Sequence, residues 1–239
     1  MGEAVGVVLA AGLGTRVGAD GNKAYLPLAG RSMLAWSLDT LTRLPEVART
    51  ILVFRRGEYE LARDTVHREL PDAQVELVEG GDTRHASESN VLSHLAADID
   101  SETVDVVAIH DAARPIAGPD MFRTAISIAR GFGGALPALP IVGLARVDAT
   151  GLESLAGEGP LVRVQTPQAF RARELLTAYR GAGHDGFEGT DTSSCVERYT
   201  DVHVRTFPGC TDNVKVTYAR DIAVAHRLLI DRRRRGAPR

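Results

Sequence analysis

Residues 5–16 read VGVVLAAGLGTR and decide the fold, because a short apolar run leads directly into a turn of small residues. Val5 to Ala11 has the length and composition of a buried strand. The small residues that follow let backbone N–H groups approach a ligand closely, and such a nest of amides attracts anions. The segment lacks both the GxxxxGK[ST] pattern and the third glycine of the dinucleotide-binding pattern. Gly12-Leu13-Gly14 alone is therefore equally consistent with an ordinary tight turn.

Two cations accompany this turn, Arg16 at its end and Lys23 seven residues further on. Two positive charges beside backbone amides suit a triphosphate, because they neutralise charge that develops on the α-phosphate and on the leaving pyrophosphate. The chain has 28 basic residues, of which only Lys23 and Lys215 are lysines. An ammonium is compact and a guanidinium is a wide planar fork, so both lysines are candidates for positions that exclude arginine. Chance retention of two surface lysines is the alternative.

Apolar runs alternate with amphipathic stretches along most of the chain. The pattern predicts strands at residues 5–11, 50–54, 74–78, 104–109, 134–139 and 202–207. It predicts helices at residues 59–70, 87–97, 119–130, 171–179, 190–198 and 218–229, and one more that Ser32 is expected to cap. This α/β rhythm is typical of a mostly parallel sheet with helices on both faces, whose ligands bind outside the carboxyl ends of the strands.

The alternation breaks between Ile141 and Val164, where apolar residues are scattered among turn formers. This stretch is either an extended arm, of the kind that often serves in dimerisation, or a long loop. No internal repeat or linker is visible in the sequence. We therefore expect one domain over residues 1–239, with residues 141–164 inserted into it as an arm.

Two further motifs follow predicted strands. In GGDTRHAS, Gly80 to Ser87, paired glycines suit a close approach to a planar base, and Asp82 supplies a polar contact; a plain turn before a helix is the alternative. In HDAARP, His110 to Pro115, Asp111 is placed to hold a divalent metal or a substrate hydroxyl. Arg114 could bind a phosphate in a bidentate manner or pair with Asp111. A packed, hydrogen-bonded imidazole is the favoured interpretation of His110.

Three more motifs lie in the last third of the chain: VQTPQAF from Val164, TDTSSCVE from Thr190 and DNVKVT from Asp212. Thr166 and Thr190 are candidate phosphate-binding hydroxyls, whereas Asp191 could cap a helix. Lys215 is expected in a short strand between valines. Because side chains alternate along a strand, valines that point into the core send Lys215 to the opposite face, towards the site.

Composition excludes several classes of protein. The formal net charge is −3, with 28 basic and 31 acidic residues, which argues against a general nucleic-acid binder. No apolar run reaches 18 residues and the N-terminus lacks a basic leader, so we expect no membrane span and a cytoplasmic protein. Cys195 and Cys210 are expected to be unpaired. The basic run Arg232–Arg235 is typical of a solvated helix end.

In series, LAAGxGxR…K, GGxxRxxS, HDAARP, QTPQxF, TD and NxKVT cover nearly the whole chain. This series resembles the 2-C-methyl-D-erythritol 4-phosphate cytidylyltransferase family of the non-mevalonate isoprenoid pathway. Ribitol 5-phosphate cytidylyltransferases share much of the pattern. The resemblance implies a Rossmann-like sheet, Mg²⁺ and a homodimer formed through an extended arm. The near-neutral charge and the lack of a long apolar run predict no nucleic-acid or membrane partner. The reaction it implies is attack of a substrate phosphate on CTP with release of pyrophosphate.

The resemblance also assigns roles to residues. Arg16 and Lys23 would stabilise the transition state, and Lys215 would act with them. The phosphorylated polyol would be held by Asp111, Arg114, Thr166, Thr190 and Lys215, with Asp111 also a candidate Mg²⁺ ligand. CTP would be held by Lys23 together with a set of mostly small residues: Ala10, Ala11, Gly12, Gly14, Gly81, Asp82, Ser87 and Ala112.

Three positions depart from the family pattern on the acceptor side. The usual Asp-Thr pair at the start of the arm is matched by Gly143 and Leu144, and a usual phosphate-binding arginine by Glu158. A smaller departure is Asn22, where a proline usually precedes the lysine. Three hypotheses follow. The first is transfer to 2-C-methyl-D-erythritol 4-phosphate, the second is transfer to another acceptor such as ribitol 5-phosphate or a phosphonate, and the third is a non-catalytic CTP-binding module.

Overall fold

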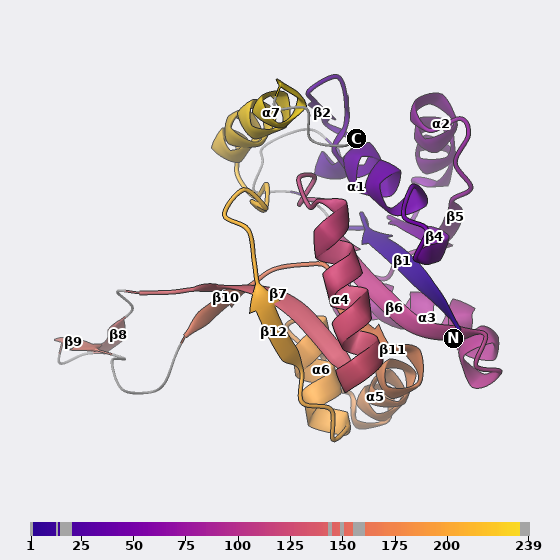
Figure 1. Cartoon of the computed structure of the whole chain (residues 1–239), viewed down its shortest axis with the longest axis vertical. Helices are drawn as coiled ribbons and strands as arrows, with labels where there is room; N and C mark the ends of the chain where they lie inside the picture. Colours follow the sequence, from indigo (N-terminus) through magenta and orange to yellow (C-terminus); the bar gives the residue numbers. More distant parts are fainter. Residues whose placement is uncertain are drawn as a thin grey trace.

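The computed structural model describes residues 2–12, 14, 21–142, 145–148, 151–154 and 161–234. Among these residues, eight strands form the central sheet in the order β10-β7-β11-β6-β1-β4-β5, with β12 paired to β7 (Figure 1). A parallel block comprises β1 (Glu3–Leu9), β4 (Val47–Phe54), β5 (Glu76–Glu79) and β6 (Val104–Asp111). The expected mostly parallel sheet is confirmed.

The other half of the sheet is mixed. β11 (Gln168–Arg171) runs antiparallel between β6 and β7 (Gly134–Pro140), and β12 (Arg205–Pro208) lies parallel to β7. The sequence pattern missed β11, because QAFR is short and contains no β-branched residue. It also missed a small hairpin of β2 (Pro27–Leu28) and β3 (Arg31–Ser32).

Helices cover both faces of the sheet, as predicted (Figure 1). Successive residues of β1 point to opposite faces of the sheet and pack into different hydrophobic cores. Val7 packs in the core formed with α3 (Arg84–Asp100), α5 (Ala172–Asp185) and α6 (Thr192–Tyr199). Val8 packs in the core formed with α1 (Met33–Thr42) and α4 (Pro119–Phe132). α2 (Tyr59–Glu69) packs beside the second of these cores. Ser32 precedes α1 but does not cap it with its side chain; its hydroxyl donates to Glu69 Oε2 at 2.9 Å instead.

A third, smaller core joins the C-terminal helix α7 (Ala219–Arg234) to the rest of the molecule. Ala225 and Leu229 of α7 pack with Leu28 of β2, with Ala113 after β6, and with Val216. This packing brings the DNVKVT motif to the carboxyl end of β6, although the two are about a hundred residues apart in the chain.

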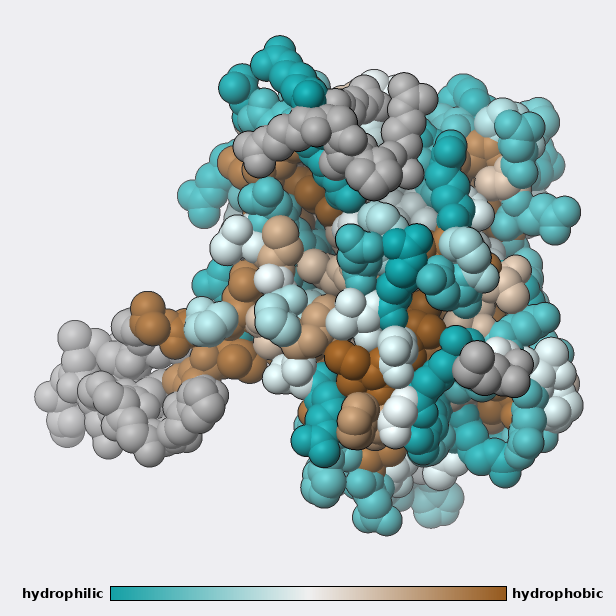
Figure 2. Space-filling view, viewed as in Figure 1, coloured by the Kyte–Doolittle hydropathy of each residue, from teal (hydrophilic) through white to brown (hydrophobic). Residues whose placement is uncertain are grey.

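The predicted arm is present in part. β8 (Ala145–Asp148) and β9 (Gly151–Ser154) pair with each other away from the central sheet (Figure 1). The expected end of the arm is wrong, because β10 (Val162–Val164) pairs with β7 and belongs to the central sheet. Apolar residues gather on the surface where the arm leaves the body (Figure 2), and Val142, Val162 and Val164 are exposed there. Within the described ranges, no helix is long and apolar enough to cross a membrane.

Candidate active site

A cavity of about 390 Å³ lies at the carboxyl ends of β1 and β6. Backbone hydrogen bonds fix the loops around it: Ala10 N–H donates to Val53 O, Gly80 N–H to Phe54 O, and Ala112 N–H to Leu9 O. The cavity is lined by residues from five separate segments: Leu9, Ala10, Ala11, Gly12, Gly14, Asn22, Lys23, Ala24, Gly81, Asp82, Thr83, Arg84, Ser87, Asp111, Ala112, Ala113 and Lys215. The predicted position of the site, outside the strand ends, is therefore the position of this cavity.

All nine residues that the resemblance assigns to CTP line the cavity: Ala10, Ala11, Gly12, Gly14, Lys23, Gly81, Asp82, Ser87 and Ala112. Asp111 and Lys215 line it as well. Arg16 lies outside the described residues, as do Gly143, Leu144 and Glu158, so their expected roles remain predictions from the sequence.

The glycines around the cavity are needed for different reasons. A Cβ added at Gly12 would meet no atom of the described residues within 4 Å, so the space beside Gly12 is open. Gly14 has φ +63°, a left-handed conformation that favours glycine. A Cβ at Gly81 would overlap the side chain of Ala86 at the start of α3. The close approach at Gly81 is thus already explained by packing within the chain, whereas no described residue packs against the Cβ position at Gly12.

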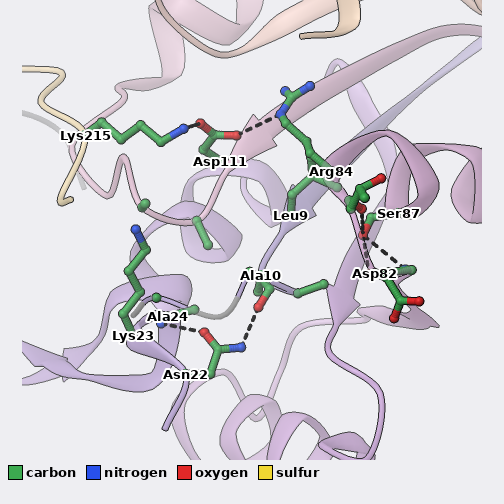
Figure 3. Close-up of a pocket in the computed structure, with 17 residues that line it drawn as sticks. Leu9, Ala10, Asn22, Lys23, Ala24, Asp82, Arg84, Ser87, Asp111 and Lys215 are labelled. Atoms are coloured by element: carbon green, nitrogen blue, oxygen red, sulfur yellow. Dashed lines mark hydrogen bonds and ion pairs between the residues drawn. The ribbon is translucent and has the colours of Figure 1, made fainter. Parts of the chain in front are cut away.

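The two lysines of the chain, Lys23 and Lys215, both line the cavity (Figure 3). The Lys23 ammonium donates to Val216 O at 2.9 Å, and the Lys215 ammonium lies 2.7 Å from Asp111 Oδ2. The expected strand around Lys215 is absent; instead, Val216 N–H donates to Ala113 O, and Val216 is buried. The inference from alternation still holds, because Val216 packs inwards while Lys215 faces the cavity.

Asp111 is a carboxylate of the cavity whose pKa is strongly shifted. It is buried, and Lys215 Nζ at 2.7 Å and Arg84 Nε at 3.6 Å face its two oxygens (Figure 3). Burial raises the pKa of Asp111, but attraction to Arg84 and Lys215 outweighs it and holds the pKa well below its usual range. Asp111 is therefore an ionised acceptor of hydrogen bonds at neutral pH. No group of three or more His, Cys, Asp and Glu side chains that could hold a metal occurs among the described residues.

Three predicted substrate ligands, Arg114, Thr166 and Thr190, do not line the cavity, and the first two are buried. The Arg114 guanidinium donates to Asn213 O at 2.8 Å and does not pair with Asp111. The Thr166 hydroxyl accepts from Asp111 N–H at 3.1 Å and lies 2.9 Å from His110 Nδ1. Both side chains are buried and are used to hold the HDAARP loop against the rest of the molecule.

His110 is the packed imidazole that we expected. It is fully buried against Phe122, and its Nε2 lies 3.1 Å from Arg114 O. Burial lowers the pKa of His110 to about 4, so the ring is neutral at physiological pH.

The TDTSSCVE motif divides into two parts. Thr190 is exposed and does not line the cavity. Asp191 caps α6, since its carboxylate accepts from Ser194 N–H at 3.0 Å and completes a capping box. This alternative, which the sequence left open, is confirmed.

Sequence reasoning missed two residues of the site. Asn22 appeared only as a departure from the family, but its amide donates to Ala10 O at 2.6 Å and its carbonyl accepts from Ala24 N–H. It thereby fastens the segment that carries Lys23 to the end of β1. Arg84 lines the cavity and faces Asp111. Its only signal in the sequence was its place in the GGxxRxxS pattern, which does not show where the side chain points.

Comparisons with known proteins agree on one family. The family model of 2-C-methyl-D-erythritol 4-phosphate cytidylyltransferase matches residues 4–231. Two proteins of that name are similar in sequence, from Cereibacter sphaeroides (38% identical over 224 residues, 93% of this chain and 95% of the relative) and Solibacter usitatus (35% over 238 residues, 94% and 95%). A solved structure of 4-diphosphocytidyl-2C-methyl-D-erythritol synthase from Anaerococcus prevotii superposes with a TM-score of 0.81 at 26% identity, covering 96% of each chain.

Proposed function

The chain belongs to the 2-C-methyl-D-erythritol 4-phosphate cytidylyltransferase family, and we propose that the cavity at the strand ends is where it carries out the transfer. The enzyme joins CTP and 2-C-methyl-D-erythritol 4-phosphate to give 4-diphosphocytidyl-2-C-methyl-D-erythritol and pyrophosphate. Ribitol 5-phosphate and other acceptors are not favoured by these relatives, and a non-catalytic CTP-binding module has no support.

We place the triphosphate of CTP along the turn after β1, beside Gly12, Gly14 and Lys23. The open space at Gly12 and the ammonium of Lys23 support this placement. We place the cytosine against Gly81 and the N-terminal end of α3, where Asp82 and Ser87 supply polar atoms.

The proposed chemistry needs no strong base. A phosphate oxygen of the acceptor attacks the α-phosphorus of CTP in line, a new P–O bond forms, and the bond to the leaving pyrophosphate breaks. The attacking phosphate dianion is already nucleophilic, so catalysis consists of positioning and neutralising charge. Lys23 and Arg16 supply that neutralisation in our proposal, and Lys23 is held in place by Val216 O.

The acceptor belongs at the opposite end of the cavity, beside Asp111 and Lys215. An ionised Asp111 accepts hydrogen bonds from polyol hydroxyls, and Lys215 faces the incoming phosphate. We assign Arg114 and Thr166 to holding the Asp111 loop rather than to the acceptor itself, because both are buried and already bonded. Thr190 stays a proposed acceptor contact, supported by its exposed side chain.

Mg²⁺ is part of this proposal. Asp82 and Asp111 are the carboxylates among the described lining residues, and Mg²⁺ is commonly held by one or two carboxylates together with substrate phosphates. The residues fit an ion that takes most of its ligands from CTP, with Asp111 as the candidate protein ligand. Such an ion would neutralise charge on the phosphates.

We further propose a single cytoplasmic domain that forms a homodimer through the arm. Exposed Val142, Val162 and Val164 at the base of the arm support burial against a second copy. The two cysteines, neither of which forms a disulfide, fit a reducing compartment.

The test of the function is pyrophosphate release from CTP and Mg²⁺ with a panel of acceptors. We expect release with 2-C-methyl-D-erythritol 4-phosphate and little with ribitol 5-phosphate or a phosphonate. Replacing CTP by ATP should abolish release. Turnover with ribitol 5-phosphate but none with 2-C-methyl-D-erythritol 4-phosphate would contradict the assigned acceptor.

A further inference from the structure

A carboxylate that the reaction does not use lies buried behind the cavity wall. Glu88 of α3 is 1% exposed, and three side chains from three helices donate to it. Its Oε1 accepts from the Arg84 guanidinium at 2.5 Å and from the Thr192 hydroxyl at 2.6 Å. Its Oε2 accepts from the Tyr179 hydroxyl. Glu88 therefore holds the side chains of Arg84, Tyr179 and Thr192 in one buried hydrogen-bond network.

Arg84 connects this network to the cavity. Its Nη1 donates to Glu88 and also lies 3.0 Å from the Thr192 hydroxyl, while its Nε lies 3.6 Å from Asp111 Oδ1. Figure 3 places the Arg84 side chain over the Asp111 carboxylate, on the side away from Lys215. Glu88 thus acts on the acceptor end of the cavity through one intervening side chain.

The geometry between Arg84 and Asp111 is not that of an optimal pair. An arginine that pairs freely with a carboxylate forms two parallel hydrogen bonds of about 2.7–2.9 Å. Arg84 stands back at 3.6 Å, whereas Lys215 approaches the same carboxylate to 2.7 Å. The bonds to Glu88 and Thr192 account for this, since they hold the far end of the guanidinium on the other side.

We propose that Glu88 is a positioning residue: it holds Arg84 back from a direct pair with Asp111, which leaves the Asp111 carboxylate open to the acceptor and to Lys215. The inference rests on the proposed role of Asp111 at the acceptor end. Without the hydrogen bond that Glu88 accepts from it, Arg84 would move onto Asp111 and compete with the substrate hydroxyls. A purely structural Glu88, which only ties α3 to α5 and α6, would affect stability and not acceptor binding.

The test compares Glu88→Gln with Glu76→Gln, which removes a carboxylate bonded to Arg49 outside the residues that line the cavity. We expect Glu88→Gln to raise KM for the acceptor about 10- to 100-fold, the usual cost of losing a supporting partner. KM for CTP should stay within about twofold, as it should for both substrates in Glu76→Gln. An acceptor KM unchanged in a folded Glu88→Gln enzyme overturns the inference.

Two further variants make the outcome decisive. If Glu88→Gln does not fold, Thr192→Val removes another hydrogen bond that holds Arg84 and keeps the Glu88 carboxyl group. The acceptor KM must rise in this variant too, and a wild-type value overturns the inference. Arg84→Gln combined with Glu88→Gln must be no worse than Arg84→Gln alone, because Glu88 acts through Arg84. If the two substitutions raise the acceptor KM by factors that multiply in the double variant, Glu88 does not act through Arg84.

Asp111→Asn separates this inference from the proposed site. If Asp111→Asn leaves acceptor KM and turnover unchanged, the assignment of Asp111 fails, and the role of Glu88 with it. If Asp111→Asn is impaired while Glu88→Gln is normal, only the role of Glu88 fails.

Discussion

Gly12 and Gly81 make a matched pair of substitutions, because both line the cavity but only one is needed for packing. A methyl group at Gly12 meets no described atom within 4 Å and requires no unusual φ, so Gly12→Ala should fold as the wild type does. Removing glycine from a compatible position even stabilises a protein by about 0.4–1 kcal/mol. The methyl group occupies space that we assign to the triphosphate. An overpacked contact costs about 1–3 kcal/mol, which predicts a KM for CTP raised roughly 5- to 150-fold.

Gly81→Ala, unlike Gly12→Ala, should destabilise the folded protein. Its Cβ would overlap Ala86, and the carbonyl carbon of that residue lies at 3.0 Å from it, so the loop and the first turn of α3 must shift. The same cost of about 1–3 kcal/mol is then paid in the folded protein and lowers Tm by roughly 2–12 °C for a chain of this size.

Thermal denaturation and pyrophosphate release at varied CTP measure both effects. A Gly12→Ala enzyme with an unchanged KM for CTP would refute the placement of the phosphates, whatever its Tm. A Gly81→Ala protein as stable as the wild type would refute the packing argument.

Three further predictions test other parts of the site. Lys23→Arg and Lys215→Arg should each lose about 100-fold in turnover, with an unchanged circular dichroism spectrum. The reason is that a guanidinium does not fit where the Lys23 ammonium reaches Val216 O or where the Lys215 ammonium reaches Asp111. Near-wild-type turnover in both variants would mean that the two lysines are retained by chance. Thr166→Val should lower Tm by roughly 2–12 °C, because it leaves Asp111 N–H and His110 Nδ1 without a partner. Thr190→Val should instead raise the acceptor KM at constant Tm, and the reverse pattern would exchange the roles of the two threonines. Hydrogen bonding to Arg49 lowers the pKa of Glu76 from 4.5 to about 2, so as pH falls the Glu76 carboxylate is protonated in the unfolded chain before it is protonated in the folded protein. The stability that the Arg49–Glu76 pair contributes is therefore lost as pH falls from about 4.5 towards 2. Glu76→Gln should flatten the decline of Tm across that interval, and an equal decline in both proteins would contradict this prediction.

Much of the fold was predictable because its signals are local. The buried strands and the amphipathic helices each carry a periodic pattern, and the carboxyl ends of parallel strands meet at one edge whatever the rest of the chain does. Small residues next to a strand end, such as Ala10 and Gly12, were therefore expected at this edge of the sheet, and both line the cavity there.

The sequence was least informative where long-range packing decides the contacts of a residue. Thr166 and Arg114 carry groups that suit phosphate, but burial beside His110 and Asn213 commits those groups to hydrogen bonds within the protein. The extended segment at Lys215 is held by Ala113 rather than by a sheet, which no periodicity reveals. The role of Glu88 was equally invisible, because a glutamate on an amphipathic helix ordinarily faces solvent, and only the packing of α5 and α6 against α3 buries it.

A crystal structure of the enzyme with CTP and Mg²⁺ tests the central claim most directly. We predict that the phosphates lie within hydrogen-bonding distance of the Gly12 and Gly14 amides and of Lys23 Nζ. The cytosine should lie against Gly81, Asp82 and Ser87, leaving the space beside Asp111 and Lys215 for the acceptor. CTP bound outside this cavity, or bound with its base beside Lys23 and its phosphates at Ser87, would contradict the account.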